Sequence, residues 1–192
     1  MSIHPEMFNK AVKVAHLLIG QKVAPGDTVV DATMGNGNDT LFLARCVGPS
    51  GKVYAFDIQP QAWAKTAARL QENGAAANVE LIRDGHENMD RHVPAGVRLV
   101  LFNLGYLPGG DKTCYTQVST TISALSRGLS LLALHGLALV AIYPGHDEGA
   151  REREAVLLFA RQLPVQKYNA FFFDLINHVN DPPVLVGIER SA

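Results

Sequence analysis

Short runs of branched apolar residues alternate with helical periodicities along this chain of 192 residues. The runs at residues 28–32, 52–58, 79–82, 97–103 and 137–143 predict β-strands. Most of them contain several consecutive apolar residues, which is typical of strands that helices cover on both faces. This pattern predicts a mainly parallel sheet.

Helical spacing of apolar residues fills the segments between these runs. Helices are predicted at residues 8–19, 41–47, 63–70 and 114–132, and after Gly149, where the apolar residues of 155–162 recur at helical spacing. The acidic Asp147 and Glu148 stand at the start of the last helix, where the helix dipole favours negative charge. Helices that separate strands in this way indicate an α/β fold.

The last part of the chain departs from this alternation. Two apolar segments, 165–176 and 184–189, are separated only by residues 177–183, which is too short a connection for a crossover helix. They predict an antiparallel hairpin. We therefore expect one domain over residues 1–192, with a seven-stranded sheet of six parallel strands and one antiparallel strand, and helices on both faces.

Composition limits the class of protein. The chain is 47% hydrophobic and 18% charged, with a formal net charge of −1, which excludes a disordered chain, a fibre and a disulfide-stapled mini-protein. A charge so close to zero means that any nucleic acid must be held over a few phosphates or by shape. Cys46 and Cys114 lack metal-ligand spacing, so no metal site is predicted and both are expected to be buried thiols. A cytoplasmic protein is expected.

The most informative segment joins the first predicted strand to the next helix. It reads Asp-Ala-Thr-Met-Gly-Asn-Gly-Asn-Asp-Thr over residues 31–40. Gly35 and Gly37 permit a close approach of the backbone that other residues would block. About twenty residues later Asp57 ends the second strand, where a carboxylate can accept hydrogen bonds from both hydroxyls of a ribose. Taken alone, the glycine segment could be a tight turn and Asp57 a solvated aspartate. Together, in this order along the chain, the two features predict a nucleoside-cofactor site.

Two details favour S-adenosylmethionine over a dinucleotide. Thr40 occupies the third glycine position of the dinucleotide motif G-x-G-x-x-G. Asp31 ends the first strand, where it would repel a diphosphate but could accept a hydrogen bond from the ammonium group of a methionine moiety. The sequence has no G-x-x-x-x-G-K-[ST] loop, so nucleotide hydrolysis is not indicated.

The run from Asp31 to Gly37 resembles the D-x-G-x-G-x-G motif of class I S-adenosylmethionine-dependent methyltransferases, with Thr33 at the first glycine position. Together with residues 103–112 and 143–149 it resembles the YtqB-like rRNA methylase family over nearly the whole chain. This resemblance implies a Rossmann-like methyltransferase fold, S-adenosyl-L-methionine as cofactor and S-adenosylhomocysteine as product. It also implies a tRNA partner, bound at the anticodon region, whose wobble 5-aminomethyluridine is N-methylated to 5-methylaminomethyluridine.

The same motifs imply where the cofactor binds. Asp31 and the backbone of residues 35–37 would hold the methionine part, Asp57 the ribose, and Asp84 the adenine amino group. For Asp84, an aspartate that caps the next helix is the alternative. The expected cofactor-binding residues are Asp31, Thr33, Gly35, Asn36, Gly37, Asn38, Asp39, Thr40, Asp57, Ile58, Asp84, Gly85, His86 and Asn103.

Residues 103–106 read Asn-Leu-Gly-Tyr and end the fourth strand, beside the expected position of the methyl donor. They resemble the [DNS]-P-P-[YFW] motif of amine methyltransferases, with Leu104 and Gly105 in place of both prolines. The Asn103 amide oxygen can accept a hydrogen bond from an amine, and the Tyr106 ring offers a flat face to a base. Carbon methylation would need a thiolate, for which Cys114 is a candidate, although packing is the favoured interpretation of that residue.

His146 is the candidate proton acceptor, because an alkylamine attacks only as the free base. The alternative is a loop histidine that bonds Asp147 and orders the following helix. The expected catalytic residues are Asn103, Tyr106 and His146. The expected substrate-binding residues are Leu104, Gly105, Tyr106, Lys112, His146 and Asn177.

Several residues around this site have two interpretations. The segment 177–183 could rim the substrate pocket or simply form a turn, and Phe171–Phe173 are expected in the core or at a dimer contact rather than under a base. The basic Lys10, Lys13, Lys22, Arg151, Arg153, Arg161 and Lys167 could touch phosphates or be solvated. A second subunit in a homodimer could complete substrate recognition. The alternative acceptors are rRNA and a small-molecule amine, and a cofactor-binding sensor or accessory subunit is the alternative of another class.

Overall fold

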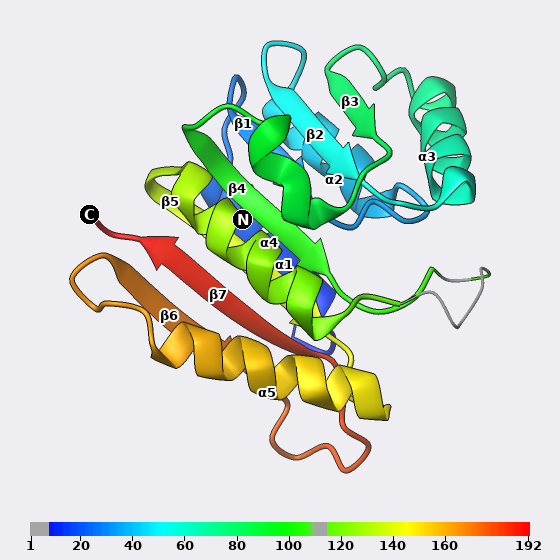
Figure 1. Ribbon diagram of the computed structural model, residues 1–192. Helices are drawn as coiled ribbons and strands as arrows, with labels where there is room; N and C mark the ends of the chain where they lie inside the picture. The colour runs from blue at the N-terminus through cyan, green and yellow to red at the C-terminus, as the bar shows by residue number, and fades with distance from the viewer. Residues whose placement is uncertain (1–7, 108, 110–114) are drawn as a thin grey trace.

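A computed structural model describes residues 8–107, 109 and 115–192. Its centre is a seven-stranded sheet in the order β3-β2-β1-β4-β5-β7-β6 (Figure 1). The strands are β1 (Thr28–Asp31), β2 (Lys52–Phe56), β3 (Val79–Ile82), β4 (Val97–Asn103), β5 (Leu132–Ile142), β6 (Tyr168–Phe173) and β7 (Val184–Arg190). Strands β1 to β5 pair in parallel, whereas β7 is antiparallel to both of its neighbours. The predicted sheet of six parallel strands and one antiparallel strand is confirmed.

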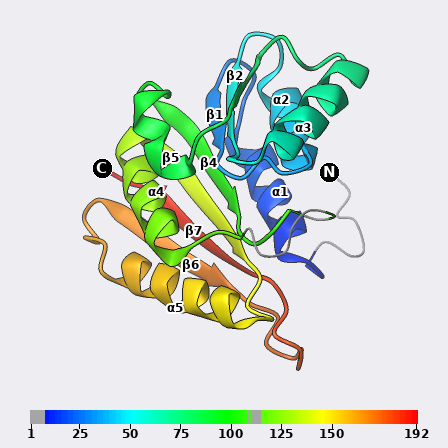
Figure 2. The same cartoon turned by 45° about the vertical axis from the view of Figure 1, so that its right-hand side comes forward.

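Helices cover both faces of the sheet (Figures 1 and 2). They are α1 (Ala11–Lys22), α2 (Asn38–Val47), α3 (Pro60–Glu72), the 3₁₀ helix η1 (His86–Arg91), α4 (Val118–Leu131) and α5 (Asp147–Arg161). Helices α1 and α2 contribute to one hydrophobic cluster, and η1, α4 and α5 contribute to the other. Along β4, Val100 and Phe102 belong to the second of these clusters while Leu99 and Leu101 belong to the first. Burial on both faces explains why this strand is an unbroken apolar run.

Some predicted boundaries were wrong. The helix expected through Leu132 ends at Leu131, and β5 starts at Leu132 rather than at Leu137. A leucine suits a helix and a buried strand equally, so the apolar stripe carried no signal for this transition. The residues expected to form the apolar stripe of α5 were also partly wrong, because Leu158 is 57% exposed while the helix buries Gly149, Glu152, Val156 and Ala160.

Sheet order decides where a ligand can bind. The chain runs outward from β1 through β2 to β3 and then returns to place β4 on the other side of β1. The loops that leave β1 and β4 therefore diverge, which opens a crevice at the carboxyl edge of the sheet. Among the helices of residues 8–107 and 115–192, none has the length and apolarity that crossing a membrane requires.

Candidate active site

A cavity of about 640 Å³ lies at this carboxyl edge, a volume typical of a small-molecule site. The expected cofactor residues that line it are Thr33, Gly35, Asn36, Asn38, Asp39, Asp57, Ile58, Asp84, Gly85, His86 and Asn103. The expected substrate residues that line it are Leu104, Gly105, Tyr106 and His146. Asp31, Gly37, Thr40 and Asn177 are not part of the lining. Lys112, with Asp111 and Cys114, lies outside the residues that the structure describes.

The two glycines of the turn after β1 serve different contacts. Both have positive φ, +49° at Gly35 and +77° at Gly37, which favours glycine. A Cβ at Gly37 would lie 2.8 Å from the Thr66 hydroxyl of α3, so this glycine permits close packing of the turn on that helix. Gly35 borders the cavity, and its carbonyl accepts a hydrogen bond from the same Thr66 hydroxyl at 3.0 Å. Of the two, only Gly35 is placed where the backbone can approach a ligand.

Asp57 connects this turn to the end of β2. Its Oδ2 accepts from the Gly35 N–H at 3.1 Å, and its Oδ1 accepts from the Gln59 N–H at 2.9 Å. Burial raises the pKa of Asp57 above that of a solvated aspartate. A carboxylate oxygen can accept more than one hydrogen bond, so both oxygens retain capacity for ribose hydroxyls at the cavity wall.

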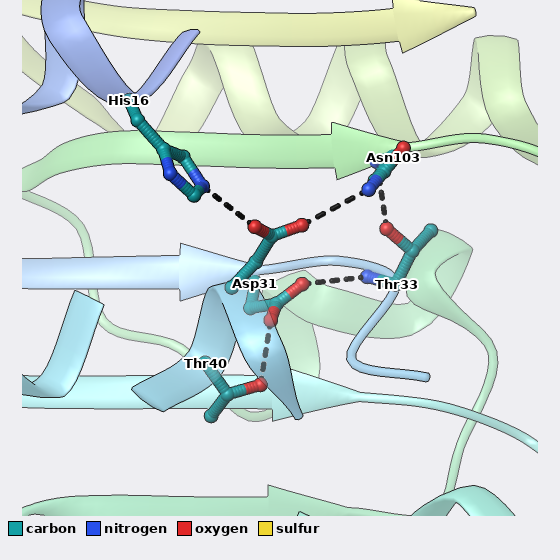
Figure 3. Close-up of polar contacts among 6 residues, drawn as sticks. His16, Asp31, Thr33, Thr40 and Asn103 are labelled. Carbon is teal, nitrogen blue, oxygen red and sulfur yellow. Dashed lines mark hydrogen bonds and ion pairs between the residues drawn. The ribbon is translucent and has the colours of Figure 1, made fainter. Parts of the chain in front are cut away.

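Asp31 lies beneath the turn, fully buried (Figure 3). Its carboxyl accepts from the Thr33 N–H at 3.1 Å and from the Thr40 hydroxyl at 2.6 Å, which ties the start of the turn to the first residues of α2. Burial, and to a lesser degree the negative charge of Asp39, raises the pKa of Asp31 to about 7. In this structure Asp31 therefore organises the turn from behind the cavity lining.

Asn103 joins the turn to the end of β4 (Figure 3). Its backbone N–H donates to the Thr33 hydroxyl at 2.7 Å, which gives a structural reason for threonine at the first glycine position of the motif. Its side-chain Nδ2 donates to Asp39 Oδ2 at 3.0 Å, while the His16 Nε2–H donates to Asp39 Oδ1 at 2.7 Å. Burial raises the pKa of the nearby Tyr143, so its phenol stays protonated at neutral pH.

The loop after β3 forms the opposite end of the cavity. Asp84 accepts hydrogen bonds from His92, from the Asn88 side chain and from the Gly85 N–H, and these bonds, that from His92 foremost, lower its pKa. It therefore orders the loop before η1 while bordering the cavity, but it is not the helix cap of the alternative interpretation, because Gly85 stands at the N-cap position and η1 has no side-chain cap bond. The His86 ring donates from Nδ1 to the Ala32 carbonyl at 3.1 Å, and burial lowers its pKa, so its Nε2 is an acceptor in a neutral ring.

A buried carboxylate holds the loop after β4. Glu152 of α5 accepts from the Thr121 hydroxyl at 2.7 Å and from the Thr116 hydroxyl at 2.8 Å. The same Thr116 hydroxyl accepts from the Gly105 N–H at 3.0 Å, and the Thr116 N–H donates to the Gly105 carbonyl at 3.1 Å. This chain of bonds fixes the approach to Tyr106, whose backbone forms an antiparallel bridge with Tyr115.

His146 caps α5. Its Nδ1 accepts from the Gly149 N–H at 3.0 Å, so in the neutral ring the proton lies on Nε2. This tautomer can donate a hydrogen bond into the cavity but cannot take a proton through Nε2. The geometry favours the alternative in which this histidine orders the helix, through Gly149 rather than through Asp147.

Several polar and basic residues from the sequence lie elsewhere. Asn177 is exposed, whereas Asp181 and Pro183 from the same loop border the cavity. Lys22 pairs with Glu189, and Arg153 lies beside Asp174 and over the Phe172 ring, so these two cations have partners within the fold. The sequence interpretation missed His16, Tyr143, Tyr115, Thr116 and Glu152 as site residues. For Glu152 a signal existed, since its spacing from Gly149 and Val156 puts it on the buried stripe of α5.

Comparisons with known proteins identify the family of this chain. Residues 53–189 match the family described as "Putative rRNA methylase". A chloroplastic tRNA (mnm(5)s(2)U34)-methyltransferase of Arabidopsis thaliana is 40% identical over 192 residues, 95% of this chain and 70% of that protein. The crystal structure of an rRNA-methylase family protein from Clostridium thermocellum has a TM-score of 0.93 and 45% identity, covering 99% of this chain and 100% of that one. A Streptococcus mutans methyltransferase homologue, solved with S-adenosylhomocysteine, has a TM-score of 0.86 and 36% identity, covering 94% and 98%.

The family match extends over most of the chain, and the Clostridium thermocellum structure covers nearly all of it. The Streptococcus mutans homologue carries the demethylated form of the cofactor that the glycine turn and Asp57 predict. This chain belongs to the rRNA methylase family of class I S-adenosylmethionine-dependent methyltransferases.

Proposed function

We propose that this methyltransferase N-methylates the aminomethyl group of 5-aminomethyluridine at the wobble position of tRNA, giving 5-methylaminomethyluridine. The name of the Arabidopsis relative, which covers nearly the whole chain, supports this acceptor. The observation that carries the proposal is the orientation of the Asn103 amide. Asp39 accepts from its nitrogen, which turns its oxygen toward other groups at the cavity wall, as an acceptor for an amine N–H.

The charges and hydrogen-bonding groups of the cavity fit S-adenosylmethionine, which carries a positive sulfonium and a positive ammonium group. The carboxylates of Asp39, Asp57 and Asp84 all border the cavity, so a cation is favoured there. Asp57 would hold the ribose, the backbone at Gly35 the methionine part, and His86 the adenine. When bound, this cofactor supplies an electrophilic methyl group.

The tyrosines at the cavity mouth suit a nucleobase. Tyr106, Tyr115 and Tyr143 all border the cavity and keep 45%, 38% and 37% of their surface exposed. Half-exposed rings can stack on an unpaired base of an RNA loop, which a small amine would not require. This feature favours RNA over a small-molecule amine as acceptor.

The amine must lose its proton before it attacks, and the residues at the acceptor end bear on this step. The Asp39 side chain lies at the cavity wall and accepts a hydrogen bond from the Asn103 amide nitrogen. His146, with its proton on Nε2, is suited to donate a hydrogen bond to the substrate and to fix the start of α5. We therefore assign His146 a positioning role and leave alignment of the two reactants as the main contribution to the rate.

One experiment separates the candidate acceptors. The purified protein is incubated with methyl-labelled S-adenosylmethionine and, in separate reactions, with tRNA or rRNA from cells that lack this methylation or with a small alkylamine. The RNA is then digested to nucleosides. Label in 5-methylaminomethyluridine is the expected result. Label only in rRNA, or only in a small amine, would identify that molecule as the acceptor instead of tRNA. No label despite calorimetric binding of S-adenosylhomocysteine would favour a cofactor-binding sensor. The homodimer and the cytoplasmic location stay predictions, to be checked by light scattering and by cell fractionation.

A further inference from the structure

We infer that His16, on helix α1, is a positioning residue for methyl transfer, because it holds Asp39 in the position that fixes the Asn103 amide. His16 lies outside the glycine turn and outside the loops that border the cavity. The inference rests on the proposed function in one respect, namely that the acceptor is an amine received by the Asn103 oxygen.

The first step concerns the direction of the amide. Asp39 offers only acceptor oxygens, and its Oδ2 lies 3.0 Å from the Asn103 nitrogen. A flipped amide would bring two oxygens together, so the carboxylate selects one of the two orientations. Figure 3 shows the selected orientation, with the Asn103 oxygen pointing away from the dashed contacts.

The second step concerns the position of the carboxylate itself. Asp39 is the second residue of α2, and its side chain could adopt other rotamers if nothing held the second oxygen. His16 holds that oxygen, at 2.7 Å from its Nε2. The two carboxylate oxygens are therefore bound from opposite sides, by α1 and by the end of β4.

The third step concerns the direction of the His16 ring. It stacks on Phe42 of α2, with centroids 4.1 Å apart and planes inclined by 13°. The contact joins α1 to α2 and aims Nε2 at Asp39. His16 therefore contributes two separable properties, an aromatic ring that packs on Phe42 and an N–H donor that meets the carboxylate.

These properties can be tested with two opposite substitutions. His16→Phe keeps the stacked ring and removes the donor, whereas His16→Gln keeps an N–H donor and removes the ring. We expect His16→Phe to lower kcat on unmodified tRNA about 10- to 100-fold, since small misalignments of reacting groups have effects of this size. The KM for tRNA and the Kd for S-adenosylhomocysteine should stay within about twofold, and His16→Gln should recover most of the lost kcat.

A double-mutant cycle with Asp39→Asn identifies the route of the effect. If His16 acts through Asp39, the double variant loses no more kcat than Asp39→Asn alone. Additive losses would overturn the inference. So would equal kcat values for wild type and His16→Phe, or a His16→Gln protein as slow as His16→Phe.

A spectroscopic readout keeps this inference distinct from the proposed function. The Asn103 side-chain NH₂ signals in ¹⁵N NMR spectra, assigned with Asn103→Ala, should show slow hydrogen exchange in wild type and His16→Gln and fast exchange in His16→Phe. This result requires no turnover. Unchanged hydrogen exchange of the Asn103 amide in His16→Phe would refute the positioning role of His16. Absence of methylated uridine with the wild-type protein would refute only the proposed acceptor.

Discussion

Replacing Thr116 by valine removes one hydroxyl from beneath the acceptor loop and keeps the shape of the side chain. That hydroxyl donates to Glu152 at 2.8 Å and accepts from the Gly105 N–H at 3.0 Å. A hydrogen bond to a charged group stabilises by about 1.5–3 kcal/mol and a neutral one by about 0.5–1.5 kcal/mol. We therefore expect the free energy of unfolding to fall by about 2–4 kcal/mol.

For a chain of this length, such a loss lowers the melting temperature by roughly 5–15 °C. The matched control is Thr116→Ser, which keeps the hydroxyl and loses one methyl group, at a cost of about 0.8 kcal/mol. Calorimetric melting of the two variants measures the difference directly.

The same substitution should affect the acceptor end of the site more than the cofactor end. The loop that Thr116 holds carries Tyr106, while Asp57 is anchored independently by Gly35 and Gln59. We expect kcat/KM for tRNA to fall about tenfold or more in Thr116→Val, with the Kd for S-adenosylhomocysteine unchanged within about twofold. A Thr116→Val protein as stable and as active as Thr116→Ser would refute the role given to the Glu152 network.

Three further substitutions test other parts of the site. Asp57→Asn should weaken binding of S-adenosylhomocysteine about 10- to 100-fold by titration calorimetry, because the charge-assisted bonds to the ribose are lost; unchanged affinity would remove Asp57 from the ribose site. Gly37→Ala should destabilise the fold by about 1–3 kcal/mol in urea, since its Cβ would meet Thr66 at 2.8 Å and φ is positive, and a neutral result would contradict that packing. Burial raises the pKa of Asp31 to about 7 from 3.8, so its contribution to stability is complete below about pH 4 and is lost as the pH rises through 7. Urea unfolding should show a loss of about 4 kcal/mol between pH 4 and pH 8 that Asp31→Asn lacks, and parallel pH profiles would disprove the shift.

The sheet could be predicted because its strands and connections depend on short segments of the sequence. Strand β4 is apolar at every position from Leu99 to Phe102, since helices bury both of its faces. The short connection between β6 and β7 leaves no room for a crossover, so the antiparallel pair followed from length alone. Residues at the carboxyl ends of the parallel strands were therefore expected to meet, and the cavity lining contains most of them.

The contacts that orient these residues could not be predicted, because they depend on pairs that lie far apart in sequence. His16 lies on the polar side of an amphipathic helix, where a solvated histidine is the ordinary expectation, and its partner Asp39 is 23 positions away. Glu152 stands between two arginines, in a segment that resembled a solvated charged face. Its helical spacing from Gly149 and Val156 indicates a buried position, but only the packing of α5 against α4 shows that two threonines bind the carboxylate.

The cofactor half and the acceptor half of the site are anchored separately and meet at one residue. Asp57 and Gly35 hold the loops after β1 and β2, whereas Glu152 holds the loop after β4 from the other side of the sheet. Asn103 bonds across this division twice, from its backbone to Thr33 and from its side chain to Asp39. Binding of each partner should therefore depend on its own half, while the rate of transfer depends on this junction, because Asn103 bonds both halves and so helps to align the donor with the acceptor. Residues that support Asn103 are expected to change kcat with little change in either binding constant, which separates them from the residues that hold one ligand alone.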